Sequence, residues 1–101
     1  MAFPGAMENL SDIRYTANKL IFSSLEEHGF AVTPHRKVII NRICEEKLVK
    51  DIEETWLSIR RQTTISWATM YMTVNLLIKL GWLVPEKVED RNKTQYRLVN
   101  I

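Results

Sequence analysis

The sequence predicts an α+β fold that is mainly helical and ends in a β-hairpin. Apolar residues recur at helical spacing in several segments before Gly81, and apolar and polar residues alternate after it. The chain has 101 residues, of which 46% are hydrophobic and 26% charged, and this suits one compact domain. We therefore expect a flexible N-terminus over residues 1–10 and a single domain over residues 11–101.

Gly29 separates the first two expected helices. Six apolar residues near helical spacing predict a helix over residues 11–28: Leu10, Ile13, Ala17, Leu20, Ile21 and Leu25. Thr33 is a good N-cap and Pro34 suits the first helical position, so the second helix should run to about Glu46. The residues expected to point inward from it are Val38, Ile39, Ile43 and Cys44.

Two more helices are expected before the hairpin. Residues 50–61 predict a short third helix with Ile52, Trp56 and Ile59 on one face. Its acidic start, Asp51, Glu53 and Glu54, complements the positive end of the helix dipole. Ser66 is expected to cap a fourth helix that runs to Leu80 and stops at Gly81. Residues 63–65 are expected to pair as a strand of one rung just before it.

The end of the chain predicts two strands, over residues 82–89 and 94–99, around the polar turn "DRNK". Asn92 tolerates the left-handed conformation that such a turn needs, and Pro85 indicates that the first strand lies at an edge. Four helices followed by a C-terminal β-hairpin wing is the order of a winged helix-turn-helix fold. In that fold the helix before the hairpin enters the major groove of DNA.

Two motifs give this order a family context. "GFAVTPHRKVII" and "ISWATMY" resemble the starts of the second and the recognition helix in the DNA-binding domain of the ferric uptake regulator (Fur) family of bacterial metal-responsive repressors. "LIKLGWL" and "RNKTQYRL" fall where the family has the end of the recognition helix and the wing, so the resemblance covers about Leu25 to Val99. It implies a bacterial transcriptional regulator that binds double-stranded DNA.

The resemblance also implies roles for single residues. Arg36 matches an arginine that contacts the DNA backbone, Tyr71 matches a tyrosine that packs on thymine methyl groups, and Thr69 matches a threonine of the same motif. Met72 stands where the family has an arginine, and "EEKLVKD" stands where it has a histidine-bearing segment. We expect the protein to lack the C-terminal domain in which the family dimerises and binds metals.

Metal binding and catalysis are not expected. His28, His35 and Cys44 do not form a recognisable ligand spacing, and structural zinc needs four clustered ligands. No serine or cysteine has a plausible base, and adjacent carboxylates on a helix point apart, so we expect neither an enzyme nor a cofactor. Cys44 is the single cysteine, which fits a reducing, cytoplasmic location. No apolar run approaches the roughly 18 residues that cross a bilayer, so no membrane contact is expected.

The expected DNA contacts are mostly phosphate contacts. Between Ser66 and Leu80, Lys79 is the single charged residue, so the fourth helix would read bases with hydroxyls, an aromatic ring and apolar groups. Basic residues around it would bind phosphates. The residues expected to contact DNA are Arg36, Lys37, Arg60, Arg61, Thr64, Ser66, Trp67, Thr69, Tyr71, Met72, Arg91 and Lys93.

An apolar stripe on the fourth helix leaves an alternative open. Met72 and Leu76 form this stripe and either pack in the core or, if the core side runs through Met70, Val74, Leu77 and Ile78, are exposed and mark a contact surface. The leading hypothesis is a transcriptional regulator without metal sensing that acts as a dimer or recruits a partner, because one domain buries little DNA surface. The alternative is a winged-helix protein–protein interaction module that has lost DNA readout, with a second copy or another protein on the fourth helix. A metal-sensing repressor ranks third.

Overall fold

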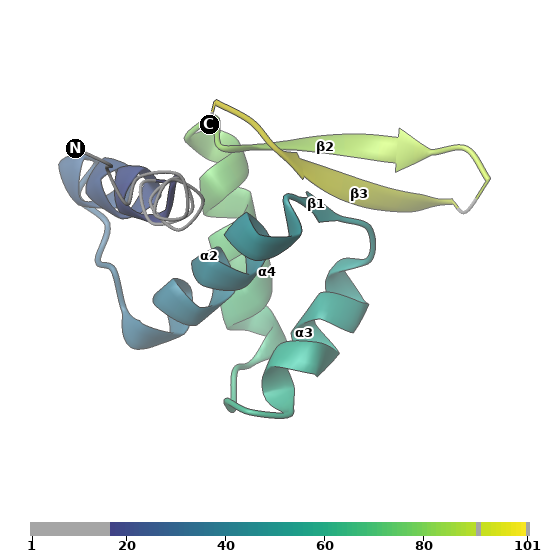
Figure 1. Cartoon of the computed structure of the whole chain (residues 1–101), viewed down its shortest axis with the longest axis horizontal. Coiled ribbons are helices and arrows are strands. Elements are labelled where there is room, and N and C mark those ends of the chain that lie inside the picture. Colours follow the sequence, from purple (N-terminus) through teal and green to yellow (C-terminus); the bar gives the residue numbers. More distant parts are fainter. Residues whose placement is uncertain (1–16, 91, 101) are drawn as a thin grey trace, which may run out of the picture.

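The computed structural model describes residues 17–90 and 92–100. A helix over residues 17–27 comes first. The elements that follow are α2 (Pro34–Glu46), β1 (Leu48–Val49), α3 (Ile52–Arg60), α4 (Trp67–Lys79), β2 (Leu83–Val88) and β3 (Lys93–Leu98). The β2–β3 hairpin projects from the helical body as a wing (Figure 1). The predicted mainly helical α+β order is confirmed, whereas the expectations for residues 1–10 and for the start of the first helix lie outside the described residues.

Polar caps and left-handed glycines define the helix ends. Thr33, Asp51 and Ser66 accept hydrogen bonds of 3.0 to 3.3 Å from backbone N–H groups in the first turns of α2, α3 and α4. These bonds satisfy donors that have no partner inside the helix. Gly29 follows the first helix and Gly81 follows α4, at φ values of +83° and +84°. Residues other than glycine rarely adopt such positive φ values. The predicted caps Thr33 and Ser66 and the predicted stops at Gly29 and Gly81 are confirmed, whereas Asp51, expected only to complement the helix dipole, also caps α3.

The sheet differs from the prediction in one strand. Its order is β1-β3-β2 with antiparallel pairs, so β2 lies at an edge, as Pro85 predicted. The strand expected over residues 63–65 is wrong, because β1 takes the place beside β3. Ile65 packs in the core instead of forming a strand pair. Its side chain is buried, and its carbonyl oxygen accepts a 2.8 Å hydrogen bond from the indole N–H of Trp56.

One apolar core joins the first helix, α2 and α4. Its most deeply buried side chains are Ile21, Leu25, Ile39, Ile40, Ile43, Met70, Val74 and Leu77. Leu20 was expected in this core, but it is 47% exposed, because the buried face of the first helix follows Ala17, Ile21 and Leu25 at four-residue spacing.

The core side of α4 is wider than predicted. Met70, Val74 and Leu77 are buried as expected, but Leu76 is only 8% exposed and belongs to the same side. Of the two interpretations of the stripe, burial in the core holds for Leu76 and exposure holds for Met72.

The two side chains of that stripe should differ sharply in their effect on stability. Leu76→Ala should lower the free energy of unfolding by about 2 to 4 kcal/mol, because it empties a buried site. Met72→Ala should change it by less than about 0.5 kcal/mol, because Met72 is 62% exposed. Urea unfolding followed by circular dichroism measures both. Equal losses would show that the exposed side of α4 has been misassigned.

The wing is tied to α3 by an ion pair. The Nζ atom of Lys93, at the start of β3, lies 2.6 Å from Oδ2 of Asp51, whose Oδ1 caps α3. The bond from Lys93 and the capping N–H groups lower the pKa of the Asp51 carboxyl below its usual value. One carboxylate thus holds both the start of α3 and the start of β3.

This arrangement predicts a pH-dependent contribution to stability. The folded-state pKa of Asp51 is depressed, so its contribution is fully present above the unfolded pKa of about 3.9 and is lost as pH falls through the folded value. Asp51→Asn keeps a cap acceptor but removes the charge. In urea titrations, the stability difference between wild type and Asp51→Asn should shrink as pH falls from 6 to 2. Glu53→Gln, in the same turn, is the control, and a difference that does not vary with pH would contradict the assignment.

Candidate nucleic-acid interface

The exposed side of α4 is aromatic and apolar. Trp67, Tyr71 and Met72 are 36%, 49% and 62% exposed, and Ala68 and Asn75 lie on the same side. Asn75 was not among the expected contacts, although it is the exposed amide of this surface. The side chains that α4 presents outward are therefore two rings, a thioether, a methyl group, one amide and, at its last residue, the ammonium group of Lys79.

The aromatic residues at the start of α4 continue onto α3. The rings of Trp56 and Trp67 meet edge to face with centroids 5.3 Å apart, and those of Trp67 and Tyr71 lie 6.1 Å apart at a tilt of 36°. The guanidinium carbon of Arg60 lies 5.0 Å from the centre of the Trp56 ring, within the range of a cation–π contact. We call these four side chains, Arg60, Trp56, Trp67 and Tyr71, the aromatic ladder.

Trp56 fixes the ladder in place. Its hydrogen bond to the Ile65 carbonyl joins the middle of α3 to the segment just before α4. Sequence reasoning assigned Trp56 to the core side of α3, and the ring does pack partly against the core. Its contact with Trp67 was missed, because only the tertiary structure brings together two tryptophans from different helices.

The hydroxyls at the start of α4 are already bonded. Those of Ser66 and Thr69 lie 2.9 Å apart, and Ser66 also caps the helix. The buried hydroxyl of Thr73 donates to the Thr69 carbonyl oxygen at 2.8 Å. The predicted hydroxyl contacts of Ser66 and Thr69 would therefore have to compete with bonds that stabilise α4.

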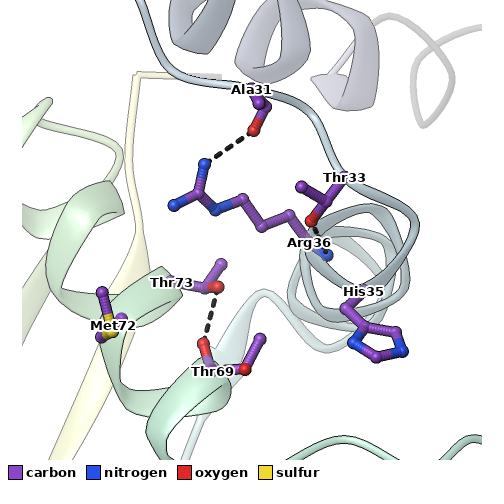
Figure 2. Close-up of a pocket in the computed structure, with 7 residues that line it drawn as sticks. All are labelled: Ala31, Thr33, His35, Arg36, Thr69, Met72 and Thr73. Carbon is purple, nitrogen blue, oxygen red and sulfur yellow. Dashed lines mark hydrogen bonds between the residues drawn. The ribbon is translucent and has the colours of Figure 1, made fainter.

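Arg36 borders a cleft next to this surface. The cleft, of about 490 Å³, lies between the start of α2 and α4 and is lined by Ala31, Thr33, His35, Arg36, Thr69, Met72 and Thr73. One guanidinium N–H of Arg36 donates to the Ala31 carbonyl oxygen at 2.7 Å. Figure 2 shows the guanidinium reaching toward α4, with the His35 ring turned away from it. The bond orients the planar group and uses one of its five N–H donors.

Charge is divided between the two ends of α3. Residues 55–85 contain no aspartate or glutamate, and their charged residues are Arg60, Arg61 and Lys79. Acidic side chains line a separate groove of about 340 Å³ near the start of α3. There, burial raises the pKa of Glu46, which accepts a 3.2 Å hydrogen bond from the Thr55 hydroxyl. The exposed side of α4 thus lies in the basic part of the chain.

The remaining residues predicted to contact DNA lie on different elements of the fold. Lys37, Arg61 and Thr64 are exposed, at the start of α2 and in the segment between α3 and α4. Lys93 is held in the ion pair with Asp51, and Arg91 lies outside the described residues. Burial, followed by an electrostatic effect of the Tyr71 phenol, raises the pKa of Tyr96 on β3.

The described residues offer no metal site of the usual kind. Within residues 17–90 and 92–100, no group of three or more histidine, cysteine, aspartate or glutamate side chains is placed to hold a metal ion. Burial, with a smaller effect of Glu45, raises the pKa of the Cys44 thiol to about 11, so it stays protonated. No helix in the described part of the chain combines the length and the apolar character needed to cross a bilayer.

Comparison with known proteins shows a structural likeness to a regulator. No protein-family model matches the sequence, and no curated protein matches it. Among solved structures, the chain is similar to a manganese uptake regulator, with a TM-score of 0.63 and 26% sequence identity over 75% of this chain. The chain spans 56% of that solved chain. The winged helix-like α+β fold predicted from the sequence is thus shared with a regulator.

Proposed function

We propose that the protein is a winged-helix transcriptional regulator that binds double-stranded DNA. The observation that carries the proposal is the likeness to a manganese uptake regulator, which extends over 75% of the chain. In this fold the helix before the hairpin enters the major groove and the hairpin follows the backbone. Here that helix is α4, and no carboxylate between residues 55 and 85 would repel the phosphates around it.

Phosphate contacts supply most of the affinity in this proposal. Arg36 and Lys37 stand at the start of α2, and Arg60 and Arg61 stand at the end of α3. All four lie on elements that adjoin α4, so they flank a groove into which α4 is inserted. The loss of counterions from DNA then drives binding of many duplexes with similar affinity.

Base contacts come from a small set of side chains. Tyr71 and Met72 are exposed and can pack on thymine methyl groups, and the exposed amide of Asn75 can pair with the edge of an adenine. Met72 offers no hydrogen bond to a base, in contrast to the arginine at this position in the Fur family. Specificity should therefore be modest.

In more detail, we propose that the protein is a Fur-like regulator that acts in the bacterial cytoplasm as a dimer and does not sense metal. Dimerisation is proposed because one domain buries little DNA surface. Independence of metal rests on the sequence "EEKLVKD", which replaces the histidine-bearing segment of the family, and on the burial of Cys44. The residues give no acid–base or nucleophilic constellation, so the proposed role is not enzymatic.

A protein-interaction module is the second candidate. It is supported by the exposure of Tyr71 and Met72 together with Leu57 on α3, which is 51% exposed. Such exposed apolar groups also suit contact with another protein.

Salt-dependent binding tests the proposal. Arg36→Ala should weaken binding to all duplexes about equally and reduce the slope of log affinity against log salt by about one unit. Met72→Arg should tighten binding, because it adds a cation on the exposed side of α4. Fluorescence anisotropy on a pool of labelled duplexes across a salt series measures both effects.

Lys50→Ala is the matched control for this experiment. It removes a positive charge from the lining of the acidic groove near the start of α3 and should leave the salt slope unchanged. Absence of salt-dependent duplex binding by wild type at low ionic strength, with a protein partner that is lost in a Met72→Glu variant, would favour the interaction module.

A further inference from the structure

The aromatic ladder offers ring faces, whereas a surface that recognises the edges of bases offers hydrogen-bond donors and acceptors. Trp67 is 36% exposed and Tyr71 is 49% exposed, whereas the neighbouring hydroxyls of Ser66 and Thr69 are hydrogen-bonded to each other. Hydrogen bonds to base edges need donors and acceptors that point outward. Aromatic rings instead offer flat faces, which stack on bases whatever their sequence.

The rings are also fixed in position before any partner binds. The indole N–H of Trp56 donates a hydrogen bond to the Ile65 carbonyl oxygen. The Trp67 ring then packs edge to face against the Trp56 ring. A surface that is already ordered loses little conformational entropy on binding. This favours stacking over a contact that would have to form during binding.

The charge around the ladder indicates which partner suits it. Arg60 belongs to the ladder and Arg61 follows it, and the nearest carboxylates in the sequence on either side are Glu54 and Glu86. Proteins that bind single strands combine a positive surface for the phosphates with aromatic rings for the bases. An apolar protein partner would use the rings but would gain nothing from the arginines.

We propose that the aromatic ladder is a stacking surface for unpaired bases, through which the protein binds single-stranded DNA in addition to duplex. The inference rests on the proposed DNA-binding function and assigns a second substrate class to the same end of α4. Trp67 and Tyr71 stack on neighbouring bases, and Arg60 and Arg61 contact the phosphates between them. Unpaired bases are required, because rings lying outside a duplex cannot reach the faces of stacked base pairs.

Oligothymidylate of about 12 nucleotides tests the proposal. Wild type should bind it in a salt-dependent manner, with quenching of tryptophan emission, because an indole that stacks on a base changes its surroundings. Trp67→Leu and Tyr71→Leu should each weaken binding about tenfold. Trp67→Leu should also remove most of the quenching, although Trp56 and Trp82 remain. Circular dichroism confirms that each variant is folded, and Tyr71→Leu keeps the test valid if Trp67→Leu unfolds.

Leu20→Ala is the matched control, since it shortens a 47% exposed apolar side chain on the first helix and should leave binding and quenching as in wild type. Binding without quenching, or unchanged affinity in both ladder variants, would overturn the proposal. A parallel titration with duplex separates the two proposals: duplex binding without oligothymidylate binding removes the ladder assignment alone. Oligothymidylate binding without duplex binding keeps the ladder and removes the duplex-binding function.

Discussion

The burial of one side of α4 against the core determines what the protein can present to a partner. The side chains of Met70, Val74 and Leu77 are at most 1% exposed, and Leu76 extends the buried side. The exposed side of α4 has one charged residue, Lys79 in the last turn, and otherwise carries the two rings, Ala68, Met72 and Asn75. A function of this helix therefore relies mainly on stacking, apolar contact and the single amide of Asn75, with most of the charge supplied by its neighbours.

The neighbours are held in place by a few polar bonds. The indole N–H of Trp56 links α3 to the segment before α4, and the Asp51 carboxylate links the start of α3 to the start of β3. Both bonds involve α3, a helix of 9 residues that is too short to be stable alone. The position of Arg60 and of the wing relative to α4 thus depends on how α3 is fixed at its start, by Asp51, and at its middle, by Trp56.

Local signals in the sequence predicted the helix ends well. Thr33, Ser66, Gly29 and Gly81 act through the backbone within one turn, so their effect does not depend on distant contacts. The order of four helices and a hairpin followed from the change in apolar spacing, and it is confirmed by the structure.

Predictions that depend on packing were less accurate. Leu20 was placed on the wrong side and the side of Leu76 was left open, because a helical stripe drawn from spacing alone does not give the width of the buried side. The strand beside β3 was expected in the wrong segment, because strand pairing joins residues far apart in the sequence. The ladder contact between Trp56 and Trp67 was missed for the same reason. The pattern available in the sequence was the absence of carboxylates from residues 55–85, which marks the basic, aromatic part of the chain.

Affinity and specificity would come from different parts of this surface. Arginines around α4 gain free energy from any phosphate backbone, and stacking on the ladder gains it from any base, so neither distinguishes sequences. Under the proposed function, discrimination would be left to Asn75 and to contacts that Tyr71 and Met72 would make with thymine methyl groups. Each mismatched base pair typically costs about 1 to 3 kcal/mol, and a small set of such contacts gives a narrow margin over non-specific DNA. A single domain of this kind would need a second copy or a partner to select one site, because two half-sites multiply that margin.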